Sequence, residues 1–206
     1  MSQLYVERHF ELNRPRDQVW EYMTDLRRAM TLDQFHMMVD CTAAEATNPK
    51  AGMVVPILHR IFGHDQIRQA RITNYRDYEI DWGESTLNGE YDPFPHSEGW
   101  KIEEVDSKTS AVTLWMKAQF RTPLGLRVGP YLWDAFIAPN LDQDVADLAH
   151  AVGAGLSRPV DPVPDNAGDL LSLAFVQTID GVPAQEFFDR LPQLYPDKTA
   201  DPASKE

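Results

Sequence analysis

The sequence predicts an α+β domain in which a curved antiparallel β-sheet of about six to seven strands wraps around a long C-terminal helix. One observation is a series of short segments of alternating polarity, separated by turn residues, between residues 53 and 120. The other is the amphipathic segment that follows them, residues 130–152. Strands joined in sequence by turns pair antiparallel, and a twisted sheet of this length curls. We therefore expect the helix to fill the curl.

The long helical segment is predicted to be bent. Its first half carries an apolar face made by Leu132, Trp133, Phe136 and Ile137. Its second half carries a face made by Leu141, Val145, Leu148 and Val152. The second face is shifted by roughly a third of a turn relative to the first. Pro139 lies at the junction, and because proline lacks an N–H and its ring clashes with the preceding turn, we expect a bend or interruption there.

The N-terminus reads as a strand followed by a helix. Residues 4–12 alternate, with Val6 and Phe10 on the apolar face. Arg8 lies on that same face, which indicates either the rim of the sheet or a buried ion pair. Pro15 then begins a helix because proline is favoured in a first helical turn, and a short second helix is expected near residues 25–31.

The remaining strands are expected at residues 35–45, 53–62, 65–75, 79–85, 99–106 and 111–120. Residues 87–97 are rich in Gly, Pro, Asn and Asp and are predicted to form a long loop. Residues 1–154 form the predicted domain. Residues 155–206 form a proline-rich acidic extension, of which 165–195 is expected to dock as packing, a lid or a homodimer contact, with a disordered end.

The net charge, the lengths of the apolar runs and the cysteine count limit the partners and the compartment expected for this protein. The formal charge of −13 repels phosphate backbones, so nucleic acid is not an expected partner. No run approaches the ~20 apolar residues that cross a bilayer, and no signal peptide is evident, which predicts a cytoplasmic protein without membrane insertion. Cys41 is the only cysteine, so neither an internal disulfide nor a thiolate metal cluster is expected.

Two stretches carry a resemblance to a known family. The segments YVERHFEL (5–12) and NRPRDQVWEYMTDL (13–26) resemble the opening strand and helix of the START-like, or SRPBCC, superfamily. This superfamily includes polyketide cyclases/dehydrases, lipid-transport proteins and Bet v 1-like proteins. The resemblance covers residues 3–153 and implies a helix-grip fold with a hydrophobic cavity between sheet and helix. It implies binding of a small lipid, polyketide or aromatic-like molecule, leaves cyclase or dehydrase activity open, and supplies neither a common catalytic motif nor a cofactor.

Alternation along the strands gives the candidate ligand-binding residues, while catalytic residues stay unassigned. The candidates are His59, Glu84, Arg71, Trp82, Trp100, Glu104, Met116 and Phe136. Arg71 belongs to this set if Ile67 fixes the phase of its strand. Buried ionisable groups suit substrate orientation or acid–base chemistry. A one-residue slip in the assigned phase would place all side chains of a strand on the opposite face of the sheet.

A metal site is not predicted, because His59 and His64 flank a probable turn at Gly63 and no third soft ligand lies nearby in the sequence. The alternative function is a non-catalytic protein-binding helix-grip module, similar to a co-chaperone or an antitoxin. A cavity filled by bulky side chains would favour that alternative. Convergent His and Glu or Arg side chains would favour ligand binding or catalysis.

Overall fold

The computed structural model describes residues 3–61, 64–87, 91–158, 160, 178–179 and 182–183. Most of these residues belong to a seven-stranded sheet with the order β1-β7-β6-β5-β4-β3-β2 and antiparallel pairing throughout. Its strands are β1 (Leu4–Leu12), β2 (His36–Val39), β3 (Val54–Ile61), β4 (His64–Arg76), β5 (Glu79–Thr86), β6 (His96–Asp106) and β7 (Thr109–Ala118). The predicted α+β class and antiparallel sheet are confirmed.

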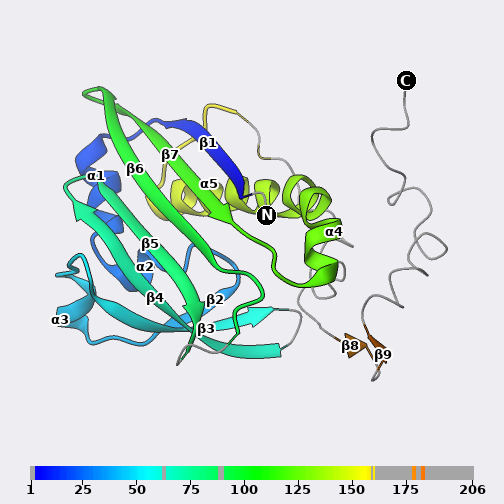
Figure 1. Ribbon diagram of the computed structural model, residues 1–206. Helices are drawn as coiled ribbons and strands as arrows, with labels where there is room; N and C mark the ends of the chain where they lie inside the picture. The colour runs from blue at the N-terminus through cyan, green and yellow to red at the C-terminus, as the bar shows by residue number, and fades with distance from the viewer. Residues whose placement is uncertain are drawn as a thin grey trace, which may run out of the picture.

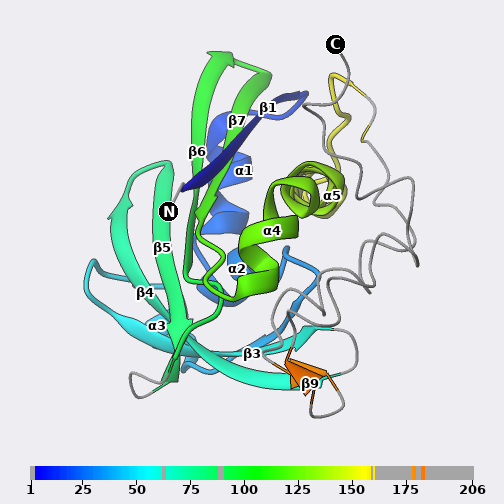
Figure 2. The ribbon, with the colours of Figure 1, turned by 45° about the vertical axis from the view of Figure 1, so that its right-hand side comes forward.

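The helices are α1 (Arg16–Met23), α2 (Leu26–Met30), α3 (Ala43–Ala46), α4 (Pro123–Leu132), a π-helical turn η2 (Trp133–Ile137) and α5 (Ala138–Ala151). Strands β8 (Thr178–Ile179) and β9 (Val182–Pro183) pair with each other. Figure 1 shows the sheet curling past α5, and the view nearly along α5 in Figure 2 shows α4 and α5 within the curl. Among the described residues, no helix has the length and apolar character needed to cross a membrane.

The long helix is interrupted as the shift of its apolar face predicted. Its α-helical pattern gives way to the π turn η2, in which the N–H of Ala138 donates to the carbonyl of Trp133, one residue before Pro139. A π turn contains one extra residue, which rotates everything after it by about 100°. This rotation accounts for the predicted third-of-a-turn shift, and both apolar faces are buried apart from the half-buried Val152. Segments α4 and α5 run in clearly different directions (Figure 2).

Two boundaries differ from the predicted ones. The strand expected at residues 35–45 ends at Val39, because Thr42 and Glu45 form a reciprocal capping box that begins α3. Strand β6 begins at His96, inside the loop expected at 87–97, because His96 pairs with both Glu84 and Ala118. The predicted docking segment 165–195 lies outside the described residues, except for β8 and β9.

Arg8 makes an ion pair with a buried partner, in agreement with its position on an apolar strand face. Its Nε lies 2.9 Å from Oδ1 of Asp142, whose side chain is 1% exposed, and Arg158 lies 3.8 Å from the same oxygen. Asp142 belongs to α5, and α5 packs against β1 and β7. The ion pair therefore joins the long helix to one edge of the sheet.

Trp115 lies across the outer face of the sheet. It pairs with Gly99 of β6, which in turn pairs with Asp81 of β5. A Cβ atom at Gly99 would collide with the Asp81 carboxylate and lie 2.7 Å from the indole nitrogen of Trp115. Gly99 therefore provides the space in which the indole lies.

We expect Gly99→Ala to lower the free energy of unfolding by about 1–3 kcal/mol, because the added methyl forces Trp115 and Asp81 apart. Gly83→Ala is the matched control: its Cβ would meet only the Ser97 hydroxyl at 3.3 Å and the His96 carbonyl at 3.9 Å. Urea unfolding followed by tryptophan fluorescence compares the two variants. Equal stability of both variants would show that the space at Gly99 is not needed.

Candidate functional site

Five ionisable side chains meet on the concave side of the sheet and form what we call the histidine–glutamate cluster. They are His36 of β2, His59 of β3, Glu84 of β5, and His96 and Glu98 of β6. Their exposed fractions lie between 3% and 9%. Such a concentration of buried ionisable groups is uncommon in a core, because each group loses hydration that its neighbours must replace.

Strand pairing and the curl of the sheet bring the cluster together. His36 pairs with His59, and their rings lie 4.3 Å apart between centroids. Glu84 pairs with His96 on its other side. Strand β4 separates β3 from β5, and its residue opposite Glu84 is the small, buried Ala70.

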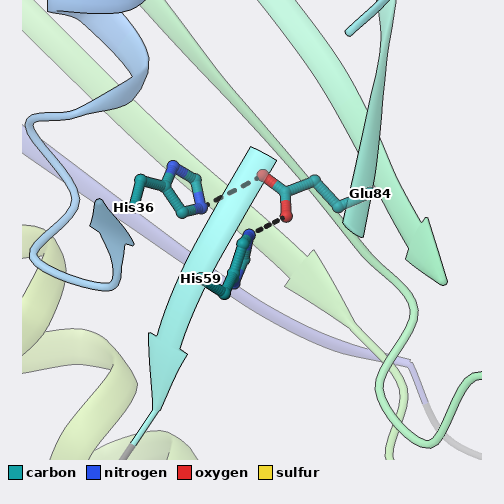
Figure 3. A group of neighbouring side chains, drawn as sticks. All are labelled: His36, His59 and Glu84. Carbon is teal, nitrogen blue, oxygen red and sulfur yellow. Dashed lines mark ion pairs between the residues drawn. The ribbon is translucent and has the colours of Figure 1, made fainter. Parts of the chain in front are cut away.

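Glu84 is the centre of the cluster. Its Oε1 accepts a hydrogen bond from Nε1 of Trp82 at 3.1 Å and lies 3.2 Å from Nε2 of His36. Its Oε2 lies 2.9 Å from Nε2 of His59 and 3.4 Å from Nε2 of His96. Figure 3 shows His36 and His59 approaching the two carboxylate oxygens from different strands.

Backbone carbonyls orient two of the three imidazole rings. Nδ1 of His36 lies 2.7 Å from the carbonyl of Met30, and Nδ1 of His96 lies 3.0 Å from the carbonyl of Phe94. A carbonyl only accepts, so Nδ1 carries the hydrogen in both rings. Nε2 of each ring is therefore the atom presented to Glu84.

The charges of the cluster shift its pKa values in opposite directions. Burial opposes ionisation of Glu84, but the neighbouring charges of His36 and His96 hold the pKa of this carboxyl well below its ordinary value. Burial also opposes protonation of His36, yet Glu84 and Asp33 raise the pKa of this imidazole well above its ordinary value. Burial lowers the pKa of His59, whereas burial and the charge of Glu84 raise the pKa of Glu98 well above its ordinary value.

Arg68, which the sequence analysis did not select, lies beside the cluster in place of Arg71. The phase assigned to β4 was wrong: Ile67 is 55% exposed, and Ala70 and Ile72 are the buried residues. Arg71 consequently points to the outer face, where it lines a shallow groove of about 400 Å³ with Lys117 and Arg121. Isolated apolar residues among polar neighbours do not fix the phase of a strand. The signal available in the sequence was the alternation of Ala70 with Ile72.

Arg68 is neutralised by Asp92 from the segment before β6. Its guanidinium donates to both Asp92 oxygens at 3.2–3.4 Å and to the Phe94 carbonyl at 3.3 Å, while its Nε lies 3.8 Å from Glu84. Asp92 also accepts from the backbone N–H groups of Thr86 and Phe94. This pair ties the segment before β6 to the rim of the cluster.

The prediction that Glu104 faces the cavity was also wrong. Its strand continues beyond the core after Ile102, and its carboxylate is 55% exposed and 3.6 Å from Arg16. The other candidates lie in the interior: Trp82, Trp100, Met116 and Phe136 are all buried. Trp82 is the one that contacts Glu84 directly.

The long helix contributes polar groups that the apolar stripe concealed. Asn140 and Asp144 are buried one turn apart on α5, and Asn140 accepts a hydrogen bond from Gln34. Burial raises the pKa of Asp144 well above its ordinary value, and the charges of Asp33 and Glu98 add to this effect. Phe136 packs on Phe35, the residue before His36, with ring centroids 5.4 Å apart. The helix therefore closes the side of the cluster that faces away from the sheet.

We expect Asp92→Ala to lower the free energy of unfolding by about 3–5 kcal/mol, because it leaves a buried guanidinium without its counter-charge. Asp65→Ala is the matched control, since Asp65 makes a similar two-bond contact with Arg60 but is half exposed. Chemical denaturation should show no appreciable change for this control. A small effect of Asp92→Ala would mean that solvent or another carboxylate replaces the lost charge.

Comparison with known proteins supports the architecture. No protein-family model matches the chain, and no curated protein matches it either. Among solved structures, the Zhui aromatase/cyclase from Streptomyces sp. R1128 matches with a TM-score of 0.57 and 16% identity, over 74% of this chain and 94% of that one. The di-domain ARO/CYC BexL matches with a TM-score of 0.53 and 18% identity, over 73% of this chain and 46% of that one.

A START superfamily protein from Mycobacterium smegmatis matches with a TM-score of 0.50 and 10% identity, over 72% of this chain and 93% of that one. Identities this low establish a shared fold and nothing finer. The observed sheet order and the helix held in its curl agree with that fold. The chain therefore has the helix-grip fold that the resemblance of its first two elements implied.

Proposed function

We propose that the protein binds a small apolar molecule carrying a carbonyl or hydroxyl group between the sheet and α5, and that it catalyses a cyclisation or dehydration of that molecule. The observation that carries the proposal is the buried histidine–glutamate cluster, in which Trp82 donates to Glu84, within an interior that also contains Trp100 and Phe136. An apolar pocket with a few convergent polar groups is the usual form of a small-molecule site.

The hydrogen bonding of the cluster supports a role beyond stability. Nε2 of His36, Nε2 of His59, Oε2 of Glu84 and Oε1 of Glu98 are buried without an aligned hydrogen-bond partner. Leaving a buried polar atom unpaired costs about 1–3 kcal/mol, so folded proteins rarely keep several together. A ligand carbonyl or hydroxyl would supply the missing partners.

The residues of the cluster also suit the proposed chemistry. Dehydration of a β-hydroxy ketone removes one proton from the carbon between the two groups and delivers one proton to the departing hydroxyl, which leaves as water. Imidazole and carboxylate side chains perform such transfers when they reach the reacting atoms. The cluster offers both kinds of side chain 2.9–3.4 Å apart, so one can accept a proton while another donates one.

The structural neighbours support the same class of substrate, because two of them are described as aromatase/cyclases. A cavity filled by bulky side chains would have favoured the protein-binding alternative. Convergent His, Glu and Arg side chains on the concave face instead favour ligand binding. The role of the extension, including a homodimer contact, remains a separate proposal.

Binding is tested with prodan, a fluorescent naphthyl ketone. We expect the full chain to bind prodan, and both Glu84→Gln and His59→Leu to weaken that binding about tenfold or more. His59→Leu removes an N–H donor to the ketone oxygen, and Glu84→Gln removes the carboxylate that orients this imidazole. His150→Gln, at an exposed position of α5, should bind as the wild type does. Native mass spectrometry of protein purified without detergent would reveal a retained ligand.

Circular dichroism and urea unfolding establish that each variant is folded. Equal prodan affinity in folded wild type, Glu84→Gln and His59→Leu would remove the cluster from the binding site. Failure of the wild type to take up prodan or retain any apolar molecule would contradict the proposed function as a whole.

A further inference from the structure

We propose that His36, His59 and Glu84 form a binding site for a divalent transition-metal ion, with Zn²⁺ as the reference ion. One ring nitrogen of each histidine and one carboxylate oxygen of Glu84 all lie within 4.8 Å of one another. The three side chains come from β2, β3 and β5 and point toward a common space (Figure 3). The inference rests on this geometry and holds whether or not the proposed function does.

The separations of the ligand atoms fit a metal site, and their alignment does not fit a hydrogen-bond network. Metal–ligand bonds of about 2.0–2.1 Å place neighbouring ligand atoms roughly 2.9 Å apart at right angles and 3.3–3.4 Å apart at tetrahedral angles. The Nε2 atoms of His59 and His36 lie 2.9 and 3.2 Å from the Glu84 oxygens. Both Nε2 atoms are nevertheless buried without an aligned hydrogen bond. Atoms this close that lack an aligned hydrogen bond are positioned to share a third partner.

Two of the three ligands, His36 and Glu84, are held in place as metal ligands commonly are. A metal-binding imidazole commonly donates its second ring N–H to a carbonyl or carboxylate, which fixes the tautomer. His36 does so through Nδ1 and the Met30 carbonyl at 2.7 Å. The Glu84 carboxylate is likewise held by Nε1 of Trp82 at 3.1 Å. Met30 and Trp82 therefore support the site from outside it.

An ion pair between protonated His36 and Glu84 is the competing explanation. It balances two charges, but it leaves Nε2 of His59 and Oε2 of Glu84, 2.9 Å apart, without an aligned hydrogen bond. The nearby cation Arg68 is neutralised by Asp92 and so does not exclude a metal ion. Glu98 and His96 form a second group with Glu84 within the same 4.8 Å limit, which adds a carboxylate to offset the charge of a divalent ion.

The donor set indicates the kind of ion and the chemistry. Two imidazoles and one carboxylate suit Zn²⁺ and also Fe²⁺ or Co²⁺, whereas Mg²⁺ and Ca²⁺ prefer oxygen ligands. Three protein ligands leave at least one position for a substrate oxygen. A metal ion there would polarise a ligand carbonyl and so assist removal of a neighbouring proton.

The sequence spacing of His59 and His64 gave no sign of this site. The partners of His59 come from residues 23 positions before it and 25 positions after it in the chain, in β2 and β5. Only the curl of the sheet across β4 places them together. A metal site assembled in this way has no short sequence motif.

The test uses the full chain, stripped of metal by a chelator and dialysed. We expect Zn²⁺ to bind with one-to-one stoichiometry in isothermal titration calorimetry, and Co²⁺ to give visible absorption bands of a nitrogen- and oxygen-coordinated ion. Glu84→Gln, His36→Gln and His59→Gln should each weaken Zn²⁺ binding by about 100-fold or more. His9→Gln and His150→Gln remove exposed histidines and should leave the affinity unchanged.

Two results would overturn the inference. One is a folded, stripped wild type that binds no Zn²⁺ and gives no Co²⁺ bands. The other is Zn²⁺ binding that survives Glu84→Gln but is lost in His9→Gln or His150→Gln. That result would place the ion on the protein surface. Glu84→Gln is nearly isosteric, and if a histidine variant fails to fold, the Co²⁺ spectrum of Glu84→Gln alone decides the outcome.

Prodan binding by metal-free protein separates this inference from the proposed function. Prodan uptake without Zn²⁺ binding would remove only the metal site. Zn²⁺ binding without uptake of prodan or any apolar ligand would remove the proposed function and leave the metal site.

Discussion

The carboxylate of Glu84 is the constraint around which the interior is arranged. Its side chain has no exposure to solvent, so the protein must supply everything that water would. Five groups do this from four directions: Trp82 on its own strand, His36 and His59 across β4, His96 on β6 and Arg68 on β4. These contacts explain why the concave face carries ionisable residues at positions where a simple core would carry aliphatic ones.

Two further ion pairs hold the frame around this centre. Arg8 and Asp142 join β1 to α5 at one edge, and Arg68 and Asp92 join β4 to the segment before β6. Arg68 and Asp92 are both buried, whereas Arg8 is partly exposed and its partner Asp142 is buried. Burial of such pairs adds little net stability, but loss of one partner is costly, so they fix geometry more than they stabilise it. Arg8 and Arg68 therefore each fix the position of one part of the structure around the histidine–glutamate cluster.

Local patterns predicted most of the fold. The alternation of β1, the proline that precedes α1 and the shifted stripe of the long helix depend only on near neighbours, so the sequence revealed them. The inward phase of His59 and Glu84 was likewise predicted from Ile57 and Trp82. The convergence of the side chains in the cluster was not predicted, because His36 and His96 reach Glu84 only through the curvature of the sheet and the register of its strands. Arg71 and Glu104 were misplaced for local reasons, namely an exposed Ile67 and a strand that extends past the core.

The π turn η2 has a consequence for how α5 meets the rest of the protein. One extra residue in that turn sets the rotation of the following fourteen residues of α5. Removal of a single residue from Trp133–Ile137 would restore a regular helix and rotate α5 by about 100°. Asn140 and Asp144 would then leave the interior, and Asp142 would leave Arg8. The number of residues in this single turn thus determines which side of α5 faces the sheet.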